Sequence, residues 1–171
     1  MSLPEVWLRG PVEGYPALLM PVAHALLQSR EDIERLVQTV PAEHAWQKPG
    51  GAASVGFHIV HAARAMDRLT TYARGEMLSD RQLRELRAED TLEQAGRSLA
   101  EAAAEALETI DRTLAQLRET APDTLLEPRH VGRKGLPSTA LGLLVHTAEH
   151  TTRHIGQAIT TAAILRGLAR P

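Results

Sequence analysis

The chain has 171 residues, 43% of them hydrophobic and 23% charged, and its 19 lysine and arginine residues nearly balance 21 aspartate and glutamate residues. A net charge of −2 offers no electrostatic attraction to a polyanion, so nucleic-acid binding is disfavoured. Because the chain has no cysteine, thiolate nucleophiles, disulfides and cysteine-based zinc sites are excluded, and any metal must be held by imidazole or carboxylate groups.

The length is typical of one domain, so we expect residues 1–171 to form a single domain around one core. The N-terminus lacks the charged-then-apolar pattern of a signal peptide, and no apolar stretch approaches the length of a membrane span. These features predict a cytoplasmic protein with no membrane partner.

Four residues that break regular structure occur near the N-terminus: Pro4, Gly10, Pro11 and Gly14. They predict an irregular arm over the first ten to fifteen residues. From about Pro16, apolar residues recur at helical spacing and predict a helix that ends near Pro41. Pro21 is an alternative start, because proline is favoured in the first turn of a helix.

Beyond the loop at Pro49–Gly51, Ser54 is placed to cap a second helix that runs to about Arg74 and is closed by Gly75. The following stretch, Leu78 to Asp90, is strongly charged. It predicts a loop with a short helical turn whose charges face solvent.

The third helix is expected from Thr91 to about Thr120, because apolar residues form one stripe along it. The stripe consists of Leu92, Leu99, Ala103, Ile110, Leu114 and Leu117. Prolines and glycines between Pro122 and Pro137 predict a sizeable crossover loop with room for a short hairpin. Ser138 is then expected to cap a fourth helix that continues to about Arg166 and stops at Gly167.

Four helices joined by connections of which two are long predict an all-α fold, a four-helix bundle with long crossover connections. No repeat of fixed period argues for a solenoid. Bundles of this kind commonly build metal sites in the core from side chains on facing helices.

Five of the eight histidines fall in two short helical windows: His58, His61, His146, His150 and His154. Residues four apart share one face of a helix, close enough for two imidazoles to reach one ion at roughly 2.0 to 2.1 Å. The last helix therefore offers either His146 with His150 or His150 with His154, and the second helix adds His58 or His61. The isolated His24, His44 and His130 are interpreted as ordinary hydrogen-bonded residues.

One motif points elsewhere. His146-Thr-Ala-Glu149-His150 matches the H-x-x-E-H pattern of inverted zinc proteases, in which the glutamate acts as base. Those enzymes need a further ligand well downstream, and few residues follow His150. The protease interpretation is therefore disfavoured.

Two segments carry a resemblance to a known family: Ser54-Val-Gly-Phe-His58-Ile-Val-His61 and His150-Thr-Thr-Arg-His154-Ile-Gly156-Gln157. They resemble the DinB/YfiT-like family of four-helix-bundle proteins, over most of the chain. The resemblance implies a divalent metal ion, most often zinc or nickel, bound by His61, His150 and His154. His58 then belongs to the surroundings of the ion or to the pocket wall, and His146 lies one turn before the usual pair.

Three protein ligands leave a coordination position for water or substrate, which is the pattern of a reactive site. The resemblance accordingly implies a metal-dependent enzyme acting on small molecules, most often by transferring a low-molecular-weight thiol such as bacillithiol, mycothiol or glutathione, with hydrolysis second. Glu149 and His58 are the nearest candidate proton carriers, although Glu149 lies about 100° around the helix from His150 and is expected in solvent.

The alternative is a non-catalytic, stress-related interaction protein in which a fourth protein ligand, His58 or His146, seals the metal site. We also expect a homodimer, the commonest oligomer, with the alanine-rich Ala102–Ala104 allowing close helix approach. Metal binding should weaken below about pH 6, since a free histidine titrates near pH 6.5.

Overall fold

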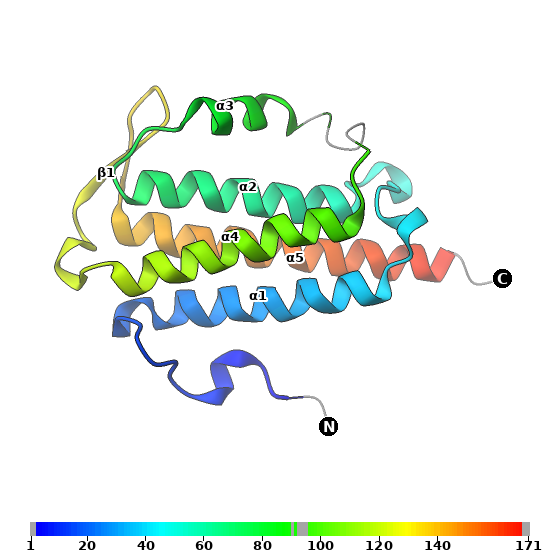
Figure 1. The fold of residues 1–171 in the computed structure, drawn as a ribbon, viewed down its shortest axis with the longest axis horizontal. Helices are drawn as coiled ribbons and strands as arrows, with labels where there is room; N and C mark the ends of the chain where they lie inside the picture. The colour runs from blue at the N-terminus through cyan, green and yellow to red at the C-terminus, as the bar shows by residue number, and fades with distance from the viewer. Residues whose placement is uncertain (1–2, 90, 92–95, 169–171) are drawn as a thin grey trace.

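A computed structural model describes residues 3–89, 91 and 96–168 of the chain. Four long helices form a bundle (Figure 1): α1 (Met20–Thr39), α2 (Val55–Ala73), α4 (Leu99–Glu119) and α5 (Ala140–Leu168). The predicted all-α four-helix bundle is therefore confirmed. Within the described residues, no helix combines the length and the hydropathy needed to cross a membrane.

The order of the helices around the bundle differs from a simple up-and-down arrangement. Helices α1 and α2 each pack against both α4 and α5, so α1 and α2 are diagonal partners. Figure 1 shows that α2 and α4 run in the same direction, as do α1 and α5. A crossover must therefore return the chain along the bundle between α2 and α4, which confirms a long connection at this point.

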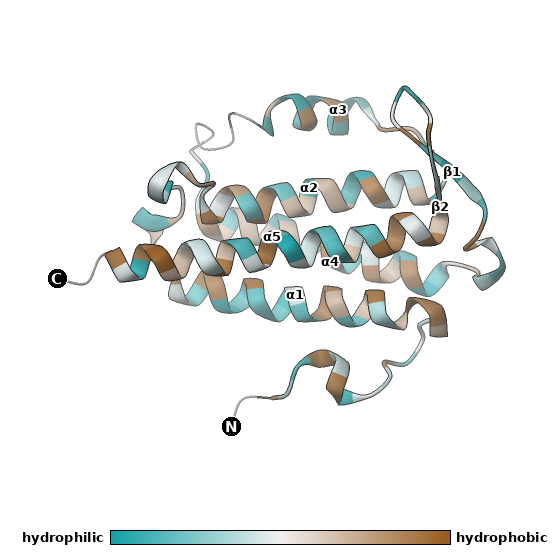
Figure 2. Cartoon of the chain, turned by 180° about the vertical axis from the view of Figure 1, so that it is seen from behind, coloured by the Kyte–Doolittle hydropathy of each residue, from teal (hydrophilic) through white to brown (hydrophobic). Residues whose placement is uncertain are grey.

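The core consists of aliphatic side chains that recur at helical spacing on the inner faces. Figure 2 shows hydrophilic and hydrophobic residues alternating around the helices, as amphipathic packing requires. The largest side chains with under 2% exposure are Leu19, Leu26, Ile33, Ile59, Met66, Ile110, Leu117, Leu125, Leu144 and Ile155. A core built from Leu, Ile and Met fits a chain with only 3% aromatic residues.

The two predicted starts of the first helix are resolved in favour of the later one. The α-helix begins at Met20, with Pro21 in its first turn, and a short 3-10 helix (Ala17–Leu19) leads into it. The arm before it contains another 3-10 helix (Val6–Arg9), which is tied to α1 because Gln28 Oε1 accepts a hydrogen bond of 3.0 Å from the Val6 amide.

The charged stretch after α2 contains more helix than the single turn expected. Helix α3 (Asp80–Arg87) spans two turns, because Ser79 and Gln82 form a reciprocal capping box at its N-terminus. Figures 1 and 2 both place α3 beside α2 and away from α1. Gln82 is buried and binds α2, where its Nε2 donates to the hydroxyl of Thr71 at 2.8 Å.

The predicted start of the third helix at Thr91 is wrong. Helix α4 begins at Leu99, because Gly96 adopts a positive φ of 66° and Ser98 caps the helix with Glu101 in a second capping box. The stripe residue Leu92 lies outside the described residues, and the remaining stripe is buried.

The predicted cap of the last helix is also wrong by one residue. Ser138 lies in strand β2 (Leu136–Thr139), which pairs antiparallel with β1 (Pro128–Val131) and confirms the hairpin in this connection. The capping role belongs to Thr139, whose Oγ1 accepts a hydrogen bond from the Gly142 amide at 3.0 Å.

Of the three alanines proposed for a dimer interface, two lie in the bundle core and Ala104 alone is exposed. Ala102 and Ala103 are 0% and 2% exposed in the bundle core, so they allow close packing of α4 within one chain. Neither Ala102 nor Ala103 can contact a second copy of the chain, and the homodimer stays a prediction.

Candidate metal centre

The site is built between α2 and α5, which pack against each other more extensively than any other pair of described elements. As predicted, Ser54 caps α2, since its Oγ accepts from the Phe57 amide at 3.1 Å. This start places His58 and His61 in the first two turns. His150 and His154 project from the middle of α5, one turn apart.

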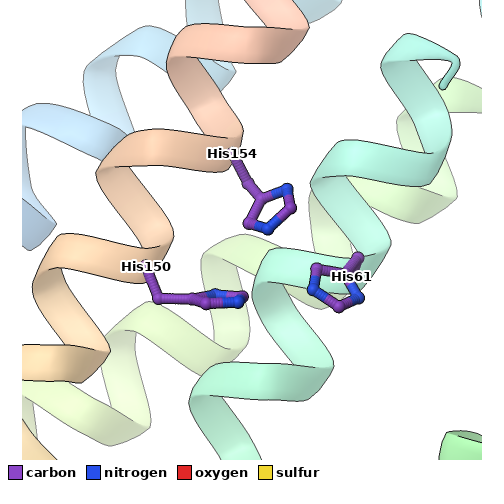
Figure 3. A group of neighbouring side chains, drawn as sticks. All are labelled: His61, His150 and His154. Atoms are coloured by element: carbon purple, nitrogen blue, oxygen red, sulfur yellow. The ribbon is translucent and has the colours of Figure 1, made fainter. Parts of the chain in front are cut away.

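Three histidines converge on one point. His61, His150 and His154 each offer a nitrogen that lies within 4.8 Å of the other two, and all three residues are partly buried. Their ring centroids are 4.4 Å (His61–His154), 5.1 Å (His61–His150) and 4.5 Å (His150–His154) apart. Figure 3 shows His150 and His154 extending from α5 toward His61 on α2.

The protonation states of this triad suit a cation. Burial, followed by the neighbouring His61 ring, lowers the pKa of His150 to about 4 and that of His154 to about 3. Both rings are therefore neutral near pH 7, with a lone pair free for a metal. Without a metal, burial and the neighbouring ring of His61 oppose protonation of His150 and His154.

The geometry also fits a metal ion. Nδ1 of His150 is buried and has no hydrogen-bond partner among the described residues. Buried polar atoms are rarely left unpaired, so a ligand at this position would satisfy it. Bonds of about 2.0–2.1 Å in a tetrahedral site place nitrogens roughly 3.4 Å apart, which small rotations of these rings can reach. Imidazole sets of this kind suit zinc and nickel.

A carboxylate that sequence reasoning missed orients His61. Nδ1 of His61 lies 3.2 Å from Oε2 of Glu89, and the other oxygen of Glu89 pairs with Arg68 at 2.7 Å. The Glu89 side chain is only 13% exposed. Burial opposes its ionisation, but the hydrogen bond from His61 and the charge of Arg68 outweigh burial and lower the pKa of Glu89. His61 can then donate from Nδ1 and keep Nε2 for an ion.

His58 supports the triad from one side. It is 7% exposed, and its Nδ1 lies 3.1 Å from Nδ1 of His154. Burial and the neighbouring His61 lower the pKa of His58. One of the two facing nitrogens must carry the hydrogen, so this contact fixes the tautomers of both rings together.

His146 and Glu149 lie outside the triad. The His146 side chain is 49% exposed and its Nδ1 faces Glu149 at 3.1 Å, while Glu149 also pairs with Arg153. Arg153 holds the pKa of Glu149 below its usual range. Glu149 is therefore a solvent-exposed acid, as expected. The H-x-x-E-H motif does not assemble a site among the described residues, because His146 is not part of the histidine cluster and its Nδ1 faces Glu149.

The remaining histidines take other contacts. His24 Nε2 meets the Gly10 carbonyl at 3.0 Å and His130 Nδ1 meets the Gly135 carbonyl at 3.3 Å, whereas Nδ1 of His44 is buried without a partner among the described residues. Asp67, a possible carboxylate ligand, is bound to Gln82 and Arg81 at 2.9 Å each. The triad is the candidate centre within the described ranges.

A cavity of about 280 Å³ opens beside the triad. Its lining includes His61, His146 and His150, and further side chains of α2, α3, β1 and the segment before α3 form the rest. The triad is therefore accessible to a small molecule from this side.

Comparison with known proteins agrees with this fold. The DinB superfamily model matches residues 25–158. The chain belongs to the DinB superfamily. No curated protein sequence matches this DinB chain closely.

Two solved structures share the fold of this DinB protein at low sequence identity. A protein from Streptococcus pneumoniae is 11% identical with a TM-score of 0.65, over 97% of this chain and 98% of the other. YfiT from Bacillus subtilis is 16% identical with a TM-score of 0.58, over 87% and 90%. YfiT is described as a probable metal-dependent hydrolase with an unusual four-helix bundle topology.

Proposed function

We propose that this DinB protein is a metal-dependent enzyme that hydrolyses small molecules, with His61, His150 and His154 as the metal ligands. The observation that carries the proposal is the convergence of three partly buried imidazoles from two helices beside a cavity. The description of YfiT as a probable metal-dependent hydrolase supports the same reaction class.

The chemistry follows from the ligand set. A zinc or nickel ion held by three imidazoles supplies a Lewis acid and lowers the pKa of a bound water. The chain's own residues prepare the site: Glu89 holds the hydrogen of His61 at Nδ1, and His58 holds the ring of His154. The cavity admits the substrate to the side of the triad that His61 and His150 share.

Transfer of a low-molecular-weight thiol such as bacillithiol, mycothiol or glutathione is the second reaction that such a site supports, because a metal lowers the pKa of a thiol as it does that of water. The non-catalytic alternative needs a fourth protein ligand. Neither candidate favours it: His58 is engaged with His154, and His146 with Glu149.

The test begins with metal analysis of untagged protein. Metal-loaded and chelator-stripped samples are then compared on two panels, one of nitrophenyl esters with water as nucleophile and one of electrophiles with the three thiols. We expect ester hydrolysis that requires the metal. If the metal-loaded protein conjugates thiols but hydrolyses no ester, the proposed reaction is thiol transfer and not hydrolysis. A protein that binds no stoichiometric metal would overturn the proposal.

Two broader expectations accompany this function. A cytoplasmic location fits an enzyme of small molecules, and a homodimer remains our prediction although Ala102 and Ala103 cannot form its interface. Light scattering at micromolar concentration checks the dimer, and a monomer mass would remove that prediction.

A further inference from the structure

The cavity beside the triad has a chemical character that narrows the substrate. Four aliphatic side chains line it, Leu69 on α2, Leu78 before α3, Leu86 on α3 and Val131 on β1, together with the ring of Tyr72 on α2. Leu78, Leu86 and Val131 come from segments outside the four long helices. Leu86 remains 43% exposed, so it forms the rim of the cavity instead of packing into the protein interior.

The cavity offers no free permanent charge to an ionic ligand, and His146, which also lines it, has its Nδ1 3.1 Å from Glu149. Among the described residues that line it, Arg68 is the one with a permanent charge. Its side chain is 11% exposed, and its guanidinium is already paired with the largely buried carboxylate of Glu89 at 2.7 Å. Taking Arg68 from Glu89 to bind a substrate anion would leave a buried carboxylate unpaired, which is strongly unfavourable.

The size of the cavity sets an upper limit on the group that it holds. An apolar cavity of about 150 Å³ binds benzene, and ordinary ligand pockets begin at about 300 Å³. A cavity of about 280 Å³ therefore accepts a group the size of a substituted ring or a short branched chain.

We propose that this cavity binds a compact, uncharged apolar group of the substrate, and that Leu86 is a residue that determines specificity for it. The inference rests on the proposed function, because the reacting bond of such a substrate lies at the end of the cavity formed by His61 and His150. Burial of a ring against Leu69, Leu86 and Val131 then fixes the substrate, and the charged residues around it stay paired with each other.

Hydroxamic acids test the proposal without knowledge of the substrate, since their polar end binds zinc. Affinities of zinc-loaded protein for acetohydroxamate, benzohydroxamate and 4-carboxybenzohydroxamate are measured by calorimetry. We expect benzohydroxamate to bind at least tenfold more tightly than acetohydroxamate, and the added carboxylate to remove most of this gain. Equal affinities for acetohydroxamate and benzohydroxamate would overturn the proposal, although tight binding of both would leave the metal site intact.

A matched pair of variants locates the apolar group. Leu86→Ala should reduce the gain of benzohydroxamate over acetohydroxamate several-fold, whereas Leu126→Ala, at an exposed leucine outside the cavity, should leave it unchanged. Equal effects of both variants would contradict the assignment of Leu86.

A metal-free measurement separates this proposal from the proposed function. Methyl resonances of Leu86 and Val131 in the chelator-treated protein should shift with benzyl alcohol and not with benzoate. If these shifts occur but the protein binds no stoichiometric zinc, the apolar cavity is retained and the proposed hydrolase is excluded. If benzyl alcohol leaves both resonances unchanged, the cavity proposal is overturned.

Discussion

Oε2 of Glu89 lies 3.2 Å from Nδ1 of His61, although 28 residues separate them in sequence. The contact joins the end of the α3 segment to the second turn of α2, and Arg68 holds the same carboxylate from the next turns of α2. The position of one histidine of the triad therefore depends on the packing of a segment outside the bundle.

Glu89→Gln should weaken metal binding about 10- to 100-fold, as loss of a partner that orients a metal-bound histidine usually does. The amide keeps the shape of the side chain but loses the charge that favours a hydrogen on Nδ1 of His61. Competition with a chromophoric chelator measures the affinity.

Glu149→Gln is the matched control for this change. Glu149 also contacts a histidine and an arginine, His146 and Arg153, but on the exposed face of α5. Its replacement should change the affinity less than about twofold. A Glu89→Gln protein with the affinity of the unchanged protein would mean that the contact does not orient a ligand.

His150→Ala should abolish stoichiometric metal binding, because the remaining two imidazoles lie on different helices and cannot form a chelate along α5. His146→Ala is the control, since it removes a histidine one turn away that the triad does not include. Calorimetry with zinc and nickel checks both variants. Loss of binding in both variants would move the site to the pair His146 and His150, and retention of binding in the His150 variant would contradict the assignment of the triad.

The helical pattern of the sequence predicted the bundle well because the spacing of apolar residues directly reflects burial on one face of each helix. The boundaries that failed were set by short-range contacts. Both involve a serine. Helix α4 is capped by Ser98 and not by Thr91, whereas Ser138, the expected cap of α5, lies in strand β2. The turn at Gly96 decides the first case, because positive φ ends regular helix.

Sequence spacing alone did not decide which histidines bind the metal: it allowed two pairs in α5 and either of two histidines in α2. The structure brings His61 next to His150 and His154, as the family resemblance implied, and turns His146 toward solvent. Glu89 was beyond sequence reasoning, because it stands in a run of exposed charges and its contact depends on how α3 packs. A buried and an exposed glutamate look alike in such a run.

Gly56→Ala should destabilise the protein by about 1–2 kcal/mol, against the usual gain of about 1 kcal/mol for this change inside a helix. An added Cβ would lie 2.8 Å from the ring of Trp46, and that ring is anchored because its Nε1 donates to the Arg97 carbonyl at 2.6 Å. Overpacking therefore outweighs the gain in helix propensity.

Gly156→Ala on α5 provides the comparison, because no atom lies within 4 Å of its added Cβ. This variant should be more stable by about 0.5–1 kcal/mol. Urea denaturation of both proteins gives the two free energies of unfolding. A gain in stability for Gly56→Ala would show that Trp46 is not held where the structure has it.

The last prediction concerns acid. Free histidines would lose a metal below about pH 6 and take up as many as three protons per ion. Burial changes this expectation, because it lowers the pKa of His150 to about 4 and that of His154 to about 3. Between pH 7 and 5 these two rings stay neutral in the metal-free protein, so protons do not compete there.

Each competing proton reduces the metal affinity tenfold per pH unit. From pH 7 to 5 we therefore expect a fall of no more than about tenfold per unit, and a steeper fall only near and below pH 4. Calorimetry in buffers of different ionisation enthalpy counts the protons, while circular dichroism confirms that the protein stays folded. A thousandfold loss per unit between pH 6 and 5 would mean that all three rings titrate like free histidines, and hence that His150 and His154 are not buried together against His61.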